Sequence, residues 1–252
     1  METRMGKIYS DALGREMEYI RYGSSGKPFF AVPSQDGRYF DFANFGMVDA
    51  VADYIEQGRI QIISFDTIDR ETWSNEGGDP AARMQLHEKW YHYVCDELYP
   101  HVMAETGYSG RAGITGCSMG AYHAANFFFR RPDLFDTVIA LSGVYDPALL
   151  IHGYFDETMY MNSPVHSLRN MPPDHPYMEL FRQSKIIICV GQGAWEELMQ
   201  IGTRELDEVL AQKGIPAWID YWGYDVNHDW PWWRKQWRYF LERTMEGWTR
   251  CF

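Results

Sequence analysis

The 252-residue sequence lacks the features that would assign it to a membrane-spanning, secreted or nucleic-acid-binding class. No apolar run reaches the roughly 18 residues that a membrane-spanning helix needs. Residues 1–5 have no apolar core, so we expect no signal peptide. Basic residues are scarce, because 23 Lys and Arg stand against 35 Asp and Glu and give a formal net charge of −12. This charge argues against nucleic acid or an anionic membrane surface as the main partner.

Cysteine is also scarce, and the four cysteines lack the spacing of a metal site: Cys95, Cys117, Cys189 and Cys251. Two of them fall in segments expected to be buried strands, so we expect reduced packing thiols and a cytoplasmic protein. No internal repeat or low-complexity segment is present. The length fits one large domain, and we therefore expect a single domain over residues 1–252.

Short apolar segments alternate with segments of helical periodicity along most of the chain. The expected strands are 28–32, 60–65, 111–117, 136–141, 185–190 and 217–222, after an opening hairpin of residues 7–10 and 15–22. The expected helices are 43–57, 80–105, 121–130, 196–212 and 231–248. This alternation predicts an α/β fold with a mainly parallel sheet covered by helices on both faces. The carboxyl ends of the strands should share one edge, where sites form.

Residues 144–184 interrupt this alternation, because they are rich in Pro, Asn, His and Tyr and have no regular period. A structureless segment this long inside a compact domain is usually functional, so we expect an insertion over the carboxyl edge of the sheet. With Trp73 and the late tryptophans it could line a substrate pocket, and Trp73 and Trp230 are the residues that we expect to contact substrate. Alternatively, the late tryptophans pack the last helix on the sheet: Trp230, Trp232 and Trp233.

The segment Gly116-Cys117-Ser118-Met119-Gly120 lies where an expected strand meets an expected helix. Its G-x-S-x-G pattern has a steric reason, because a serine on a sharp strand-to-helix turn needs neighbours without side chains. The turn also directs the first helical N–H groups toward whatever the hydroxyl attacks. The pattern predicts that Ser118 is a catalytic nucleophile, with a purely structural turn as the alternative.

A serine hydroxyl is a poor nucleophile until a base removes its proton, and eight histidines are available. His228 follows the last expected strand in a polar loop, at the sheet edge that Ser118 should reach, so we expect His228 to be the base. The histidines of the insertion stay open as alternatives: His152, His166 and His175. The others lie on expected helices and fit surface or packing roles: His87, His92, His101 and His123.

The third member of such a site is a carboxylate that orients the imidazole. Hydrolases with a serine on this turn have the chain order serine, acid, histidine, which places the acid before His228. The segment from Gly191 onward follows an expected strand and ends in Glu196 and Glu197. Because a helix start attracts acidic residues without any catalytic role, the residues alone leave the choice open, with Asp225 as a further candidate.

With these residues the chain resembles the putative-esterase branch of the α/β-hydrolases. This branch includes feruloyl esterases, S-formylglutathione hydrolase, enterochelin esterases and mycolyltransferases. Four segments carry the resemblance: Gly116-Cys117-Ser118-Met119-Gly120, Arg131-Pro132-Asp133-Leu134-Phe135, Leu141-Ser142-Gly143 and His228-Asp229-Trp230-Pro231-Trp232-Trp233. It extends from Lys7 to Leu241 and implies an α/β-hydrolase fold.

The resemblance also bears on the acid. Many relatives have an aspartate three residues after the strand-end glycine, where this chain has Ala194. The mycolyltransferases instead carry a glutamate six residues after the first glycine of a Gly-x-Gly segment, and this position corresponds to Glu197. The resemblance therefore favours Glu197 as the acid, with Glu196 as second choice.

The developing oxyanion of such a reaction needs two donors. One is expected from the backbone N–H of Met119, and the other from Ser34 or Gln35 in the loop after the 28–32 strand. This loop lacks the His-Gly pair that is common in relatives.

The implied activity is hydrolysis of a small-molecule carboxylic ester through an acyl-enzyme on Ser118. No metal or organic cofactor is required, and a homo-oligomer stays open. Peptidase, thioesterase and acyltransferase activities would use the same residues. The alternative from a different class is a non-catalytic binding module on a hydrolase scaffold, which the altered acid position favours.

Overall fold

The computed structural model describes residues 1–151 and 153–247. His152 and Cys251, which are named above, lie outside this described part, as does the last residue of the helix expected over 231–248. No helix within the described part has both the length and the apolar character needed to cross a membrane.

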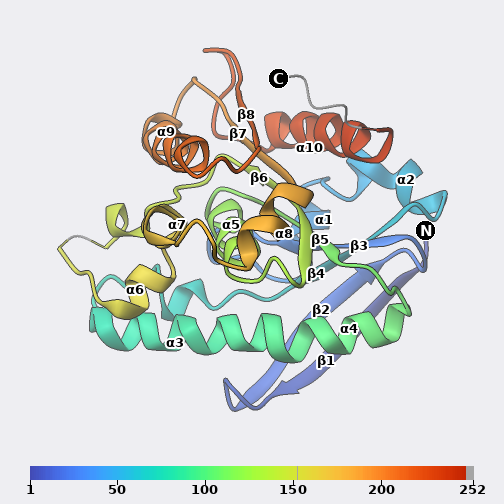
Figure 1. The fold of residues 1–252 in the computed structure, drawn as a ribbon. Coiled ribbons are helices and arrows are strands. Elements are labelled where there is room, and N and C mark those ends of the chain that lie inside the picture. The colour runs from blue at the N-terminus through green and yellow to red at the C-terminus, as the bar shows by residue number, and fades with distance from the viewer. Residues whose placement is uncertain (152, 248–252) are drawn as a thin grey trace.

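An eight-stranded sheet forms the centre of the molecule, in the order β1-β2-β4-β3-β5-β6-β7-β8 (Figure 1). Its strands are β1 Thr3–Ser10, β2 Arg15–Tyr22, β3 Lys27–Val32, β4 Ile60–Phe65, β5 Ala112–Cys117, β6 Phe135–Leu141, β7 Lys185–Val190 and β8 Trp218–Tyr221. The first two strands form an antiparallel hairpin that joins β4, and all neighbouring pairs from β4 to β8 are parallel. The expected α/β fold with a mainly parallel sheet is confirmed.

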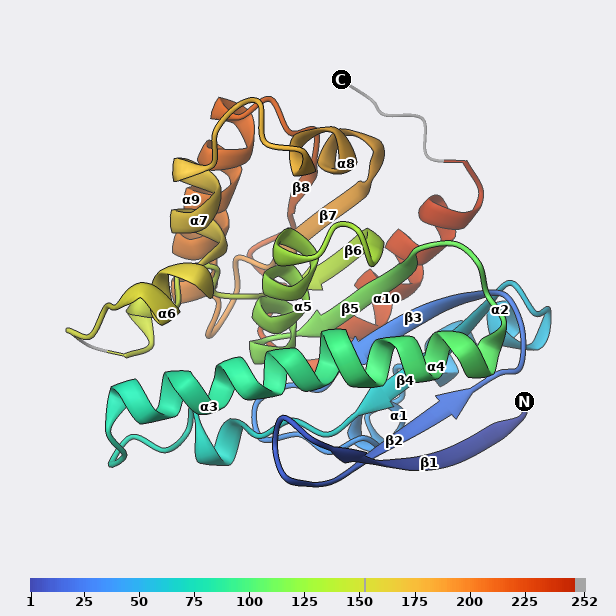
Figure 2. The same ribbon diagram turned by 60° about the horizontal axis from the view of Figure 1, so that its bottom comes forward.

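Helices cover both faces of this sheet (Figure 2). On one face the core includes residues of α3 Pro80–His92, the π-helical segment η3 Tyr93–Leu98, α4 Tyr99–Thr106, α5 Met119–Arg130, α7 Pro164–Asn170, α8 Tyr177–Gln183 and α9 Glu197–Gln212. On the other face it includes residues of α1 Asp41–Asn44, the 3-10 turn η1 Asp49–Val51, α2 Ala52–Glu56 and α10 Trp230–Met245. The continuous apolar character of the central strands follows from this double cover, and β4 and β5 are buried along their whole length.

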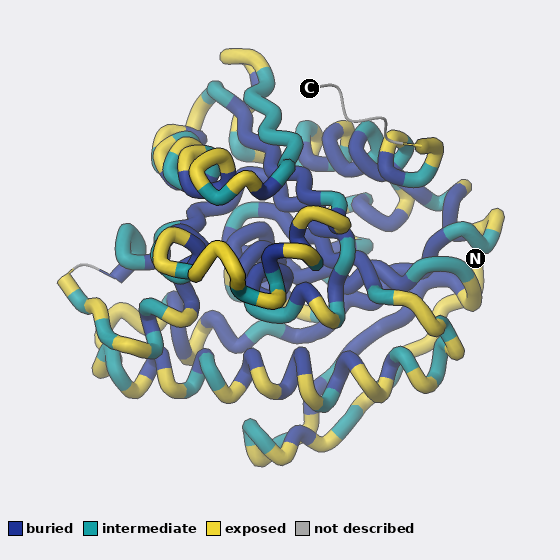
Figure 3. The backbone as a smooth tube through the Cα atoms, in the orientation of Figure 1, coloured by how far each residue is buried: buried dark blue, intermediate teal, exposed yellow. Residues whose placement is uncertain are grey.

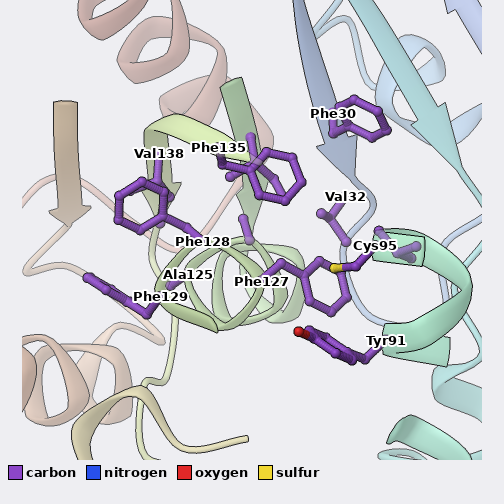
Figure 4. Close-up of a cluster of buried hydrophobic side chains, with 14 of the residues drawn as sticks. Phe30, Val32, Tyr91, Cys95, Ala125, Phe127, Phe128, Phe129, Phe135 and Val138 are labelled. Carbon is purple, nitrogen blue, oxygen red and sulfur yellow. The ribbon is translucent and has the colours of Figure 1, made fainter. Parts of the chain in front are cut away.

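Helix α5 is buried from Met119 to Phe129 and is the helix that follows the candidate nucleophile. Its aromatic residues pack against side chains of β3, β6 and α3 (Figure 4), and those labelled there include Phe127, Phe128, Phe129, Phe30, Phe135 and Tyr91. Close packing on all sides fixes this helix against the sheet, which holds its first turn in one place.

The long helix expected over residues 80–105 is continuous, but its middle is the π-helical segment η3 between α3 and α4. One stripe of this long helix is buried and another is exposed to solvent (Figure 3). The expected single helix over residues 43–57 is wrong. Gly46, with φ 77°, turns the chain after α1, and the remainder forms η1 and α2.

Residues 144–184 are not structureless, contrary to expectation. They contain the 3-10 turn η4 Pro147–Leu149 and α6 Glu157–Met161 as well as α7 and α8. Side-chain caps start two of the helices, because Asp156 accepts a hydrogen bond from Met159 N and Ser163 accepts one from His166 N. Helices α7 and α8 join the core beside α5, whereas Ile151 and Met159 from the first half pack with Met119. The first half is therefore close to the start of α5.

At two glycines in the turn between β5 and α5, backbone segments lie so close together that a side chain would not fit between them. A Cβ atom on Gly116 would lie 2.2 Å from the carbonyl oxygen of Gly120. A Cβ atom on Gly120 would lie 2.4 Å from the carbonyl oxygens of Val32 and Pro33. Because backbone atoms are the obstacle, they can give way only if the strand, the helix or the loop after β3 shifts.

We therefore expect Gly120→Ala to lower the free energy of unfolding by at least about 2 kcal/mol, as other overpacked buried sites do. Urea unfolding followed by far-UV circular dichroism measures the change. Gly77→Ala is the matched control, because a Cβ atom there meets no atom within 4 Å. Equal midpoints for the two variants would show that the turn tolerates a side chain.

Candidate active site

Ser118 occupies the turn between β5 and α5 in a backbone conformation that non-glycine residues rarely adopt. Its φ is 58° and its ψ is −124°, and its N–H donates to the carbonyl oxygen of Leu141 at 2.9 Å. This bond ties the turn to the carboxyl end of β6. The side chain therefore projects from the sheet edge at which the parallel strands end.

His228 lies directly against this serine, as the sequence predicted for a base. Its Nε2 is 2.9 Å from Ser118 Oγ, and its side chain is largely buried. The loop that carries it is fixed by the bond from His228 N–H to the carbonyl oxygen of Ala194 at 3.0 Å. The ring edge of Trp233 contacts the imidazole at 4.7 Å between centroids, with the planes 87° apart. In this geometry Nε2 can accept the serine proton, provided that Nδ1 carries the other proton.

The carboxylate beside this imidazole belongs to Glu196 and not to Glu197, so the expected placement of Glu197 is wrong. Glu196 Oε2 lies 3.3 Å from His228 Nδ1, and the Glu196 side chain is fully buried. The two atoms are not aligned as in an ideal hydrogen bond. Such bonds are often long without substrate and tighten in the reacting complex.

The reason for the difference lies in the residue before these glutamates. Trp195 has φ 68° and a side chain that is 80% exposed, and Glu196 follows it as the cap of α9. The left-handed conformation turns the chain, so that Trp195 faces outward and Glu196 inward. Glu197 is the first residue of α9 and is exposed to solvent. Acidic residues stabilise a helix start, which accounts for Glu197 without a place in the site.

Ser142 holds Glu196 and is itself bonded to Trp233, and neither residue was expected from the sequence to hold the acid. Ser142 Oγ donates to Glu196 Oε1 at 2.6 Å and accepts from Trp233 Nε1 at 3.1 Å. Both side chains are buried. The sequence did contain a signal for Ser142: it follows the strand that became β6, so it could be expected at the same sheet edge as Ser118. The chain from Trp233 through Ser142 orients a buried charge that would otherwise be poorly solvated.

Within the described residues, four non-glycine residues have positive φ: Asp36, Ser118, Ser142 and Trp195. Ser118 belongs to the Ser118–His228–Glu196 cluster, Trp195 directly precedes Glu196, and Ser142 donates a hydrogen bond to Glu196. Asp36 lies in the loop after β3. Residues in such conformations store strain and persist only where their surroundings fix them, which is common at functional sites. Their concentration here marks this edge as the chemically specialised part of the molecule.

The loop after β3 runs beside the start of α5. Pro33 contacts Gly120, and Ser34 begins a turn in which its carbonyl oxygen accepts from Gly37 N–H at 2.9 Å. Asp36, with φ 60°, is the third residue of this turn. Among the residues that the structure describes, the N–H groups of Ser34 and Gln35 donate to no protein acceptor. Met119 N–H, the first of α5, has no intrahelical acceptor either. These groups are free to donate to a bound oxygen atom.

The two residues expected to contact substrate pack against other aromatic side chains. Trp73 is only 5% exposed, and its Nε1 donates to His87 Nδ1, so it packs in the interior. Trp230 is half-buried and stacks on Phe45 at 4.1 Å between ring centroids.

The alternative bases and the further acid have other contacts or surroundings. His166 pairs with Ser163 and Asp146. His175 accepts from Tyr177 N–H, and Asp225 is exposed.

A thiol also lies beside the candidate nucleophile. Cys117 precedes Ser118 and is free and fully buried, and burial raises the pKa of its thiol well above the ordinary value. Cys189 at the end of β7 is buried as well, and burial likewise raises its pKa. Both remain neutral packing groups, as expected, so neither competes with Ser118 as an attacking group.

In residues 1–151 and 153–247, no three or more His, Cys, Asp or Glu side chains are grouped so that they could hold a metal ion. The arrangement is instead a hydroxyl, an imidazole and a carboxylate in a row. Such a row can move one proton off the hydroxyl and stabilise the resulting imidazolium.

Comparison with known proteins gives one family and many similar folds. The family described as "Putative esterase" matches residues 10–240. An S-formylglutathione hydrolase from Agrobacterium tumefaciens superposes with a TM-score of 0.73 at 13% identity, covering 97% of this chain and 94% of that one.

Two other solved structures are similar over nearly the whole chain. The S-formylglutathione hydrolase FrmB from Staphylococcus aureus gives a TM-score of 0.68 at 16% identity, covering 97% of this chain and 98% of that one. A CE1 ferulic acid esterase from Anaeromyces mucronatus gives 0.71 at 12% identity, covering 97% and 90%. At sequence identities this low, the similarity to these structures establishes the fold alone.

The support of Glu196 by Ser142 can be tested directly. Ser142→Ala removes the donor to Oε1 and leaves a buried charge short of a partner. We expect the rate at which a fluorophosphonate labels Ser118 to fall roughly 10-fold or more, because the imidazole is then less well held. Intact-mass spectrometry over time measures this rate. Ser184→Ala is the matched control, because Ser184 is also buried but donates to Leu180 O, outside this cluster. Equal rates in both variants would contradict the assignment.

Proposed function

The chain belongs to the putative esterase family, and we propose that it is a serine hydrolase that cleaves small-molecule carboxylic esters through an acyl-enzyme on Ser118. One observation carries the proposal: His228 Nε2 lies 2.9 Å from the Oγ of a serine on a strained strand-to-helix turn. That contact is what converts a weak hydroxyl into a nucleophile.

In the proposed first step, Ser118 Oγ attacks the ester carbonyl carbon while its proton passes to His228 Nε2. A tetrahedral intermediate forms, and its collapse expels the alcohol, which takes the same proton from His228. In the second step, water loses a proton to His228 and attacks the acyl-enzyme. The second tetrahedral intermediate collapses, the bond to Ser118 Oγ breaks, and Oγ takes the proton back from His228 as the carboxylic acid is released.

We assign the acid role to Glu196. Its carboxylate is buried, lies 3.3 Å from His228 Nδ1 and has Ser142 as a donor on its other oxygen. A carboxylate held in this way fixes the proton on Nδ1 and stabilises the imidazolium as it forms. Glu197, which the family resemblance favoured, is exposed and would have to leave the start of α9 to serve.

The oxyanion of the intermediate would be bound by the N–H of Met119 and by a second N–H from the loop after β3, from Ser34 or Gln35. Support comes from the lack of other acceptors for these groups among the described residues. Two donors of this kind, placed in advance of the reaction, account for much of the rate enhancement in acyl transfer.

For the substrate we propose a chemical class, small-molecule carboxylic esters, and no particular acyl or alcohol group. Trp230 lies two residues after His228 and is half-buried, so its ring is the candidate for contact with the ester. Thioesters and acyl transfer to another alcohol would use the same residues. A cytoplasmic location is part of the proposal, supported by the unpaired thiols of Cys95, Cys117 and Cys189.

The proposal predicts one phosphonate adduct per chain. Fluorophosphonate treatment should add one equivalent of mass on the peptide that contains Ser118, and Ser118→Ala should show none. Hydrolysis of a short-chain aryl ester should fall by roughly three or more orders of magnitude in both Ser118→Ala and His228→Ala. A folded parent protein without an adduct, and without ester hydrolysis, would favour the non-catalytic binding module.

The assignment of the acid predicts a difference between two neighbouring glutamates. Glu196→Gln should slow ester turnover by roughly 10²- to 10⁴-fold, because a neutral amide cannot stabilise the imidazolium. Glu197→Gln is the matched control and should stay within a few-fold of the parent. Steady-state kinetics on the same aryl ester measures both. The reverse order would return the role to Glu197, and near-normal rates in both would leave a Ser–His pair.

A further inference from the structure

A second buried histidine–carboxylate pair lies beside the proposed site and has no part in the proton transfer. His123 Nε2 and Asp69 Oδ1 are 2.9 Å apart, and both side chains are fully buried. Removing a carboxylate from water is costly, and packing alone gives no reason to place one here. The bonds of Asp69 indicate what the pair does.

The two residues come from two different segments of the chain. His123 is on α5, five residues after Ser118, so it belongs to the helix whose first N–H is the first donor. Asp69 begins the 3-10 turn η2 Asp69–Glu71 after β4. The contact between His123 and Asp69 therefore joins the helix of Ser118 to the segment that follows β4.

The other oxygen of Asp69 reaches the loop after β3. Asp69 Oδ2 accepts from the backbone N–H of Asp36 at 3.4 Å. The carbonyl oxygen of Asp69 accepts from Ser74 N–H at 2.8 Å, and Ser74 Oγ donates to Asp36 Oδ1 at 2.7 Å. Gln35 Nε2 in turn donates to Ser74 Oγ at 2.8 Å. The turn that carries the second donor is thus bonded to Asp69 both directly and through Ser74.

The hydrogen bond to Asp69 is made by Asp36, a residue in a strained backbone conformation. Asp36 has φ 60°, and without an acceptor for its N–H the turn would be free to relax toward an ordinary conformation. Relaxation would rotate the neighbouring peptide planes, including the N–H groups of Ser34 and Gln35. A donor that moves by about 1 Å loses much of its effect on a developing charge.

The surroundings of His123 are aromatic. His87 stacks on its ring at 5.3 Å between centroids, and Trp90 packs edge-on at 4.9 Å. Burial lowers the pKa of His87 well below its ordinary value, and His87 accepts from Trp73 Nε1 at Nδ1, so it stays neutral. The position of the His123 ring is therefore fixed by packing, and through it the position of Asp69.

We propose that Asp69 and His123 are positioning residues, which hold the second oxyanion donor in the loop after β3 at a fixed place relative to Met119 N–H. The inference rests on the proposed function, because it concerns the donors of the same acyl transfer. Neither residue touches the reacting atoms. They act through the backbone of Asp36 and through helix α5.

The test compares His123→Ala, His123→Gln and Asp69→Asn with the parent on a short-chain aryl ester. His123→Ala and Asp69→Asn should lower kcat roughly 10- to 100-fold with KM within about threefold, because the donors act on the transition state more than on the bound ester. The rate of labelling by a fluorophosphonate, whose adduct also places an oxygen between the donors, should fall in parallel. His123→Gln, which can keep an N–H toward Asp69, should recover much of the loss.

Asn126→Ala is the matched control, because Asn126 is buried on the same helix but donates to Asn162 Oδ1, away from the loop. It should leave kcat within about threefold of the parent, and urea unfolding of every variant confirms that folded protein is compared. If His123→Ala does not fold, Asp69→Asn, which keeps side-chain size, decides the question.

Folded His123→Ala and Asp69→Asn with parental kcat would overturn the inference, as would an equal loss in Asn126→Ala. A parent that neither turns over the ester nor reacts with the phosphonate contradicts the proposed function itself, and the inference with it. An active parent with unaffected variants contradicts the positioning role alone.

Discussion

The close approach of three backbone segments at Gly116 and Gly120 is the constraint on which the site depends. Strand β5, helix α5 and the loop after β3 meet where a single additional carbon atom would be 2.2 to 2.4 Å from a carbonyl oxygen. This contact forces Ser118 into its strained turn and brings the loop of Ser34 to the start of α5. The buried aromatic face of α5 then prevents the three segments from separating.

Around this contact, two buried carboxylates are each held from both sides. Glu196 lies between the imidazole of His228 and the hydroxyl of Ser142, and Asp69 lies between His123 and the backbone of Asp36. Buried charges add little to stability by themselves, but they select one arrangement of their partners, because any other arrangement leaves the charge unsolvated. In the proposed mechanism both pairs orient groups that act at Ser118, one through the base and one through the backbone.

The features that could be predicted from the sequence are those that depend on local residue patterns and on the order of the strands. The buried strands were visible as apolar runs, and the positions of Ser118 and His228 followed from the rule that parallel strands end at one edge. The residues alone left Glu196 and Glu197 open, and the family resemblance favoured Glu197. A single positive φ at Trp195 instead turns Glu196 toward His228. Asp69 and His123 were not predicted as a pair, since their contact depends on how a turn after β4 packs on α5. The helices of residues 144–184 were missed because they are short and depend on caps and on packing against α5.

The separation along the chain between Ser118 and its base has a consequence for biosynthesis. The two residues are 110 positions apart, and between them lie β6, β7, β8 and the intervening helices. A ribosome delivers the chain from the N-terminus, so Ser118 emerges long before His228, its proposed base. Until β8 has joined the sheet and the loop after it has formed, His228 does not lie beside the Ser118 hydroxyl. In the proposed mechanism that hydroxyl is not activated before this point.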